Sequence, residues 1–165
     1  GLPFEFVRAI QKLYKNNYHI IKLAGRLFRG PLLTAGVRQG CPLSMILFAL
    51  CLEPLLRLIE KYMDNGDVVG ALADDISIVL QNLRKMLPKF IALFNLFAKA
   101  SGLDLNFAKC IVVPLDDTPD CINSCRTLIN EVAPIWSSFK VQMQAEYLGF
   151  WLGPEGHAKQ WNGII

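Results

Sequence analysis

The chain has few of the residues that build disulfide-rich scaffolds or zinc sites. It has two isolated histidines and five cysteines, an odd number without a repeated C-x-x-C spacing. We therefore expect neither a disulfide framework nor a zinc site, and the simplest location is a reducing intracellular compartment, nucleus or cytoplasm. Cys121 and Cys125 could share a helix face, where two small apolar side chains are a simpler interpretation than two ligands.

Targeting and membrane signals are also lacking. The first residues, Gly1 to Glu5, include no initiator methionine, no basic segment and no small-residue cleavage site, so we expect no signal peptide and a start within a longer sequence. The longest apolar run, Met45 to Leu52, is much shorter than the roughly 20 residues that span a bilayer, and Glu53 follows it. These features predict no transmembrane helix and no membrane partner.

The composition is that of a globular protein with a sizeable core. Of the 165 residues 53% are hydrophobic, and the mean hydropathy is +0.33. That is rich for a free-standing domain, so we expect neighbouring segments of a larger protein to cover part of the surface. The net charge of +3 permits a nucleic-acid partner without arguing for one.

Apolar periodicity predicts helices and strands without a strict β-α-β order. The predicted helices cover 2–14, 43–63, 82–100 and 120–132, and Pro54 should kink or divide the second. The predicted strands cover 18–23 and 30–37, joined by a basic tip at 25–29, then a hairpin around an acidic turn, a strand pair or strand-turn-strand at 103–115, and a hairpin at 141–152 around Gly149. This order favours an α+β fold with an antiparallel sheet packed on helices.

Basic and aromatic residues are interleaved around the first predicted hairpin. They are Tyr14, Lys15, Tyr18, Lys22, Arg26, Phe28, Arg29 and Arg38. A run of charge is usually a solvated face, but this mixture also suits a surface that follows a nucleic-acid backbone.

Asp74 and Asp75 stand side by side within an apolar stretch, 70–80. The β-branched and small flanking residues predict two short buried strands with an acidic turn between them. Two buried carboxylates would cost several kcal/mol or become protonated, whereas a divalent cation would keep both ionised. The alternative is a simple Asp-Asp turn at a hairpin tip, since aspartate is a common turn residue.

A second motif, 36–44, precedes the Asp pair at the start of a long predicted helix. It contains two glycines, an arginine, a glutamine and a proline, a combination that lets backbone approach a ligand while helix N–H groups face outward. By itself it could equally be a strand-to-helix turn.

Four motifs in order give the chain a resemblance to the reverse transcriptases of non-LTR, LINE-type retrotransposons. They are Gly36 to Ser44, Leu72-Ala73-Asp74-Asp75, Gly102 to Cys110 and Glu146 to Gly153. The resemblance implies a polymerase palm-like sheet with a primer-grip hairpin near the C-terminus. It divides the chain into a partial palm domain at 1–153, with a fingers/palm hairpin at 18–37, and the start of a truncated thumb or linker at 154–165.

The resemblance also implies roles for individual residues. Asp74 and Asp75 would be catalytic metal ligands for Mg²⁺ or Mn²⁺, and Lys109 would steady or protonate the departing pyrophosphate. The positions implied for binding nucleotide and template are Gly36, Arg38, Gln39, Gly40, Pro42 and Ser44, and those implied for the primer grip are Tyr147, Leu148 and Gly149. The implied substrate is a deoxynucleoside triphosphate, and the implied partners are an RNA template, a DNA primer and the upstream and downstream segments of the same polymerase.

The chain departs from the family pattern at two points. Leu72 stands where the family usually has an aromatic residue before Ala-Asp-Asp. The family's further metal-binding aspartate lies on a strand before the glycine-glutamine motif, and Glu5 is the only carboxylate before Gly36. We therefore expect a polymerase fragment that is inactive alone; the alternatives are a non-catalytic nucleic-acid-binding remnant and a functionless retroelement relic.

Overall fold

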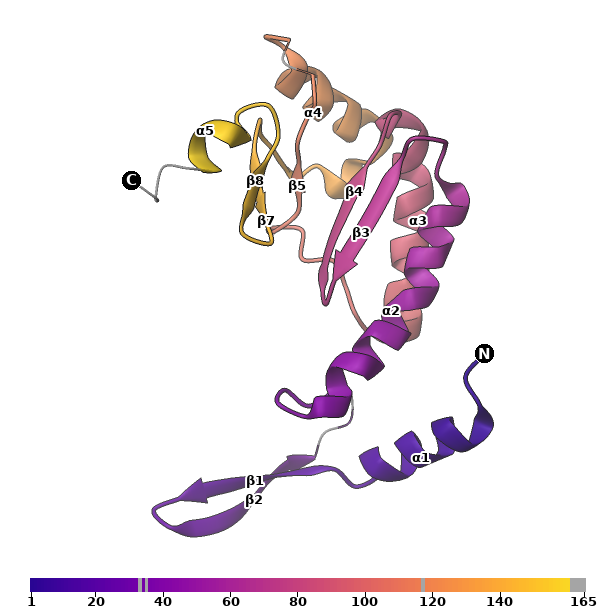
Figure 1. Ribbon diagram of the computed structural model, residues 1–165, viewed down its shortest axis with the longest axis vertical. Helices are drawn as coiled ribbons and strands as arrows, with labels where there is room; N and C mark the ends of the chain where they lie inside the picture. The colour runs from indigo at the N-terminus through magenta and orange to yellow at the C-terminus, as the bar shows by residue number, and fades with distance from the viewer. Residues whose placement is uncertain (33, 35, 117, 161–165) are drawn as a thin grey trace. The chain divides into compact units, whose positions relative to one another are not determined.

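The computed structural model describes residues 1–32, 34, 36–116 and 118–160 (Figure 1). The chain divides into two compact units, Gly1–Ser44 and Met45–Ile165. Each unit is described by itself below. Helices and strands are mixed in both, so the α+β class predicted from the sequence is confirmed at this level.

The first unit contains one helix and one hairpin. Helix α1 (Phe4–Tyr14) is followed by β1 (Tyr18–Leu23) and β2 (Arg26–Leu32). The helix ends before Asn16, whose φ of 55° lies in the left-handed region that asparagine tolerates better than most residues. Every side chain of α1 is exposed or half-buried, although its apolar residues share one face.

The hairpin of the first unit differs from the prediction. Its second strand begins at Arg26 and ends at Leu32, not at 30–37, so the predicted tip at 25–29 was wrong. Ala24 and Gly25 form a two-residue turn with φ of 48° and 77°, the signs of a type I′ turn, which matches the twist of paired strands. Asn-Gly is the usual sequence signal for this type of hairpin turn, and Ala24-Gly25 does not match it, so the turn was not recognised in the sequence. Of the predicted strand, residues 33 and 35 lie outside the described residues.

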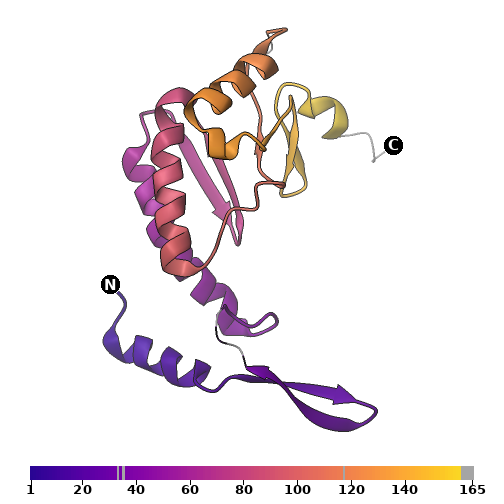
Figure 2. The same ribbon diagram turned by 180° about the vertical axis from the view of Figure 1, so that it is seen from behind.

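The core of the second unit lies between two long helices and a hairpin. Helices α2 (Pro42–Tyr62), which begins in the last residues of the first unit, and α3 (Leu83–Ser101) lie on one side of the hairpin formed by β3 (Val68–Leu72) and β4 (Asp75–Val79) (Figures 1 and 2). The buried apolar side chains that these two helices contribute to the core cluster are Leu52, Leu55, Ile59, Met86, Leu87, Phe90 and Leu93.

Helix α2 runs through Pro54 as one helix, so the predicted division at that residue was wrong. Proline inside a helix costs about 3 kcal/mol. Leu55 and Ile59, which follow it, are 2% and 0% exposed. Burying two such side chains is worth roughly 3 to 6 kcal/mol, which is enough to offset the proline.

By length and composition alone, α2 could cross a membrane, and it is the one helix in the described part of the chain that could. The apolar run at 45–52 is shorter than the helix that contains it, because α2 continues past Glu53 to Tyr62. The length of the run alone therefore did not reveal a helix long enough to cross a membrane. A core helix of a soluble protein meets the same criterion, and α2 supplies Leu52, Leu55 and Ile59 to the buried core.

Helix α3 has the ends that the sequence predicted, to within one residue. The side chain of Asn82 accepts a hydrogen bond from the N–H of Lys85 at 3.0 Å, which caps the first turn. Gly102, with φ of 73°, ends the helix in the left-handed conformation, and its N–H donates to the carbonyl of Ala98 at 2.8 Å.

The segment after α3 is mostly irregular, with a turn at 107–109, so the strand pair or strand-turn-strand predicted at 103–115 was wrong. Only β5 (Ile111–Val112) is a strand, and it pairs in parallel with β6 (Lys140–Val141). Between them lie α4 (Cys121–Val132) and a short 3₁₀ helix, η1 (Pro134–Trp136), whose buried Trp136 stacks on Phe139 at 5.1 Å between ring centroids. A partner so distant in sequence leaves no local periodicity by which it could be recognised.

The last elements are a small hairpin and a short helix. Strands β7 (Ala145–Tyr147) and β8 (Phe150–Leu152) are joined by a turn at Leu148 and Gly149, so the hairpin predicted at 141–152 is present but shorter. Helix α5 (Gly156–Gln160) follows and was not predicted. In place of the one expected antiparallel sheet, the described residues form four two-stranded sheets, three antiparallel and one parallel.

Candidate functional site

Asp74 and Asp75 lie at the tip of the β3–β4 hairpin. Leu72 and Asp75 form the last strand pair, Ala73 and Asp74 form the turn, and Ala73 has a φ of 53°. Both carboxylates are exposed, so the expectation of a buried acidic turn was wrong. The pair therefore needs no cation to compensate for burial, and a metal-binding role must rest on other grounds.

The two faces of this hairpin differ. Val69, Ile76 and Ile78 point toward the helices and pack against the core cluster. The strand register places Asp75 and Leu72 on the opposite face, where Leu72 is 59% exposed. The hairpin thus turns the Asp75 side chain away from the core cluster.

A hydrogen bond joins this hairpin to the β7–β8 hairpin. The hydroxyl of Tyr147 donates to the backbone carbonyl of Asp75, with 3.5 Å between the two oxygens. The two residues are 72 positions apart in sequence, and each comes from a motif that the resemblance assigned to a polymerase. Leu148 and Gly149, with φ of 53° and 83°, make the tight turn that follows Tyr147.

The Asp tip offers ligands of the right chemistry for a hard divalent cation. Carboxylate oxygens are what Mg²⁺ and Mn²⁺ prefer, and two adjacent exposed carboxylates can share such an ion with phosphate oxygens. Within the described residues, however, no group of three or more histidine, cysteine, aspartate or glutamate side chains could hold a metal ion. The tip is part of a metal site at most.

Lys109 makes no polar contact with the Asp tip among the described residues. Its N–H donates to the carbonyl of Asn106 at 2.9 Å, in a turn between α3 and β5, and its side chain is exposed. In the described part of the chain, no hydrogen bond or ion pair joins it to Asp74 or Asp75.

The glycine-glutamine motif belongs to the first unit. Gly36 and Gly40 have φ of 79° and 83°, a conformation that favours glycine, although a Cβ at either position would meet no atom within 4 Å. The guanidinium of Arg38 donates to the carbonyl of Tyr18 at 3.2 Å and thereby ties the motif to β1. Gln39 and Pro42 are exposed, whereas Ser44 is buried.

Cys41 lies within the glycine-glutamine motif, and the sequence analysis assigned no role to it. It immediately precedes Pro42, the first residue of α2, so helix N–H groups face its side chain. The N–H of Leu43 is the largest cause that lowers the pKa of the Cys41 thiol below its ordinary value, and the positive charge of Arg38 adds to it. A cysteine directly before a proline at a helix start is the signal that could have identified it.

We expect alkylating reagents to modify Cys41 before Cys110 and Cys125. Burial raises the pKa of the latter two thiols, and the thiolate is the reactive form. Because the pKa of Cys41 is lowered, its reactivity should persist as pH falls to values at which the other two thiols are fully protonated. Iodoacetamide labelling from pH 6 to 8, read out by peptide mass spectrometry, measures the order; faster labelling of Cys110 or Cys125 would contradict it.

Comparisons with known proteins identify the family of the chain. The family model described as reverse transcriptase (RNA-dependent DNA polymerase) matches residues 3–152. The chain is 32% identical over 113 residues to the transposon TX1 uncharacterized 149 kDa protein of Xenopus laevis, over 64% of this chain and 9% of that protein. It is 30% identical over 122 residues to the retrovirus-related Pol polyprotein from type-1 retrotransposable element R2 of Nasonia vitripennis, over 69% of this chain and 12% of that protein.

No solved structure matches the chain. The chain spans about a tenth of the length of the curated relatives it matches, 9% and 12%. Over that part it is homologous to proteins of LINE-type retrotransposons. Because the family model covers residues 3–152, the chain belongs to the reverse transcriptase family.

Proposed function

We propose that this chain is part of an RNA-directed DNA polymerase and carries one side of its nucleotidyl-transfer site. The observation that supports this best is the hydrogen bond from Tyr147 to the carbonyl of Asp75. It joins the hairpin with the candidate metal ligands to the hairpin with the candidate primer grip. A polymerase needs these two together, because the primer end must lie at the metal ions.

In this proposal, Asp74 and Asp75 bind divalent cations through their carboxylates. Bound Mg²⁺ or Mn²⁺ would stabilise the attacking and leaving oxygens as the primer 3′ hydroxyl displaces pyrophosphate from a deoxynucleoside triphosphate. Asp74 is the primary ligand and Asp75 supports it. The exposure of both side chains leaves their oxygens available for metal and phosphate.

The other motifs hold the nucleic acid in this proposal. Tyr147, Leu148 and Gly149 place the primer end, and the partly exposed Leu148 at the turn is available for contact. The turn at 36–44 places template and nucleotide, with the two glycines allowing close approach of the backbone. The β3–β4 hairpin with α2 and α3 would be the palm-like part, the β1–β2 hairpin at 18–32 the fingers/palm hairpin, and 154–160 the beginning of a thumb or linker. Residues 161–165 of that predicted segment lie outside the described residues.

Lys109 is the proposed group that steadies or protonates the leaving pyrophosphate. Its ammonium is exposed and its backbone turn is held by the Asn106 carbonyl, so the side chain is free to extend toward an anion. With template and primer bound, the protein supplies position and charge while base pairing supplies the sequence specificity.

The isolated chain should be inactive in this proposal. The described residues contain no third carboxylate beside Asp74 and Asp75 that could complete a metal site. A two-metal reaction that lacks one ligand loses several kcal/mol of transition-state stabilisation, which corresponds to at least about 10³-fold in rate.

Primer extension on an RNA template with Mg²⁺ tests the proposal. The 165-residue chain should give background signal, whereas a longer polypeptide that joins it to an upstream reverse transcriptase segment with the third carboxylate should extend the primer. Robust synthesis by the isolated chain, abolished by Asp74→Ala, would overturn the inactivity. The proposed catalytic role would be wrong if the longer polypeptide bound nucleic acid in a salt-dependent way but did not extend the primer with Mg²⁺. That result would favour a non-catalytic nucleic-acid-binding protein.

A further inference from the structure

The start of α2 surrounds the side chain of Cys41 with groups that favour a negative charge. Pro42 is the first residue of the helix, so Cys41 stands directly before it. The first N–H groups of a helix lack a carbonyl partner in a preceding turn and attract anions. The N–H of Leu43 lowers the pKa of the Cys41 thiol most, and the charge of Arg38 lowers it further. The environment of this sulfur therefore suits a thiolate.

Ser44 places a buried hydroxyl beside the same sulfur. The residue is 6% exposed, and its hydroxyl oxygen has no hydrogen-bond partner among the described residues. The backbone holds the two residues together, because the N–H of Ser44 donates to the carbonyl of Cys41 at 3.0 Å. After the Leu43 N–H, this hydroxyl is the next cause that lowers the pKa of the Cys41 thiol. A buried hydroxyl without a partner costs stability, and here it is free to donate to a negative charge or an added oxygen on the sulfur.

The approach to Cys41 is open. The thiol is half-buried, whereas Gln39 and Gly40 before it are exposed. A Cβ at Gly40 would meet no atom within 4 Å, so the turn leaves space next to the sulfur. A small oxidant can therefore reach the thiol, and a larger group attached to it has room outside the fold.

We propose that Cys41 is a modification site at which hydrogen peroxide and then glutathione react. The thiolate attacks one peroxide oxygen and forms an S–O bond, the O–O bond breaks, and hydroxide leaves. The sulfur is thereby oxidised to a sulfenic acid and the peroxide is reduced. The thiol of glutathione then forms an S–S bond to this sulfur, and the sulfenic hydroxyl leaves with the thiol proton as water. The Leu43 N–H and the Ser44 hydroxyl stabilise the thiolate before the first step and the sulfenic oxygen after it.

The modification also regulates the polymerase, a consequence that rests on the proposed function. Gln39 and Gly40 belong to the turn proposed to place template and nucleotide. A glutathione adduct on the next residue brings bulk and carboxylates to that turn, where it obstructs an anionic template. Extension should therefore stop when Cys41 is modified and resume when a reducing thiol removes the adduct. The reactivity of Cys41 itself depends on no catalytic role.

Treatment of the full 165-residue chain with hydrogen peroxide and glutathione tests the site. Cys51 is the internal control, because it is exposed in the interior of α2, where N–H groups are bonded within the helix. Access alone favours Cys51, whereas the surrounding donors favour Cys41. Peptide mass spectrometry at pH 7 should show the adduct forming at least about threefold faster on Cys41, because a tenfold gain in thiolate is offset by about a threefold loss in nucleophilicity. Equal rates, or a faster Cys51, would overturn the inference.

Ser44→Ala separates the chemistry of the site from its structure. Loss of a hydrogen bond to a charged sulfur should slow the reaction of Cys41 about threefold and leave that of Cys51 unchanged. The midpoint of thermal unfolding should stay the same or rise, because the hydroxyl has no partner to lose. An unchanged rate at Cys41 in this variant would show that Ser44 does not act on the thiolate and would contradict the proposed site.

Primer extension by the longer polypeptide measures the consequence. Peroxide with glutathione should lower its rate about tenfold or more, and dithiothreitol should restore the rate. A Cys41→Ser polypeptide should keep its own untreated rate after the same treatment. Equal inhibition of this variant would assign the effect to another cysteine and overturn the regulatory role of Cys41. If the untreated longer polypeptide extends no primer, the proposed function is wrong, and the order of labelling in the 165-residue chain still decides whether Cys41 is the modification site.

Discussion

Asp74→Ala should lower primer extension at least about 10³-fold in a longer polypeptide that carries this segment and an upstream metal-binding carboxylate. The proposed ligand would be lost, and a deficit of about 4 kcal/mol in transition-state stabilisation corresponds to that factor. Asp74 is exposed at a hairpin turn, so its removal should leave the fold intact. Extension rates under saturating Mg²⁺ and nucleotide measure the effect.

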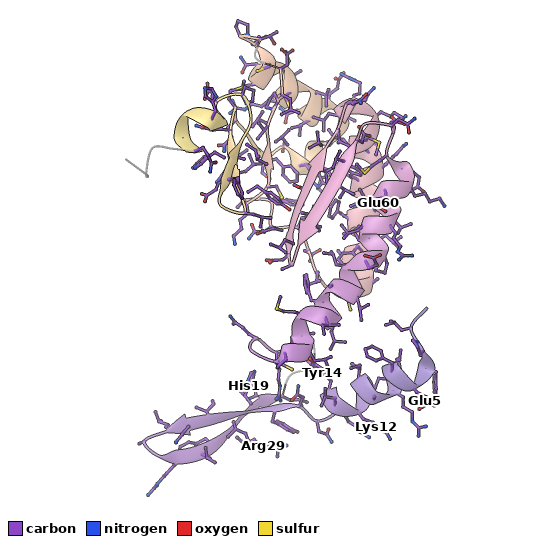
Figure 3. The ribbon with its side chains drawn as sticks, viewed as in Figure 1. Glu5, Lys12, Tyr14, His19, Arg29 and Glu60 are labelled. Carbon is purple, nitrogen blue, oxygen red and sulfur yellow. The ribbon has the colours of Figure 1, made fainter. Side chains whose placement is uncertain are left out.

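Glu60→Ala is the matched control, because Glu60 is an exposed carboxylate on α2 (Figure 3). It should keep extension to within about twofold. If Asp74→Ala retained more than a tenth of the activity of the unchanged polypeptide, the carboxylate would not be a metal ligand and the role proposed for the tip would be wrong. Unchanged midpoints of thermal unfolding in both variants would show that any loss of extension comes from the lost carboxylate and not from a loss of stability.

Ile59→Ala should destabilise the chain by about 2 to 5 kcal/mol. Ile59 is 0% exposed, in the cluster where α2 packs against α3, and truncation leaves a cavity that the neighbours can fill only in part. For a chain of this size, the midpoint of thermal unfolding should fall by roughly 4 to 20 °C. Circular dichroism of the isolated chain measures it.

Ile46→Ala provides the comparison on the same helix, because Ile46 is 56% exposed. It should change stability by no more than about 0.5 kcal/mol. Equal effects of the two substitutions would mean that α2 does not pack as the structure shows. A broad, non-cooperative transition in the unchanged chain would instead support the interpretation of a relic without a stable fold.

The helices could be predicted from the sequence because their signals are local. Asn82 and Gly102 mark the ends of α3 through capping and left-handed backbone, which depend only on neighbouring residues. Of the kink or division predicted at Pro54, the division was wrong because the outcome depends on Leu55 and Ile59 packing in the core. Local propensity cannot include that energy.

The strands were less predictable, and for a different reason. The parallel partner of Ile111 is Lys140, beyond an intervening helix, and the short strands have too few residues for a period of two to be recognised. Because the turn is formed by Ala24 and Gly25 alone, the second strand of the first hairpin starts four residues earlier than predicted, at Arg26 and not at residue 30.

The candidate site was predictable as a set of motifs and less so as a physical environment. The sequence placed the Asp pair at a hairpin turn, but an apolar neighbourhood in sequence was mistaken for burial in space. The contact of Tyr147 with Asp75 spans 72 positions and could not be inferred from spacing. The roles of the individual residues remain predictions for the extension and binding experiments above.

The first turn residue of each antiparallel hairpin is a non-glycine residue in the left-handed region. Ala24, Ala73 and Leu148 have φ of 48°, 53° and 53°. Each such residue costs roughly 1 to 2 kcal/mol in backbone strain, which makes the hairpin tips inexpensive to open relative to the strands behind them. Under the proposed function, we therefore expect the backbone to adjust most readily at the tips next to Asp74 and Tyr147.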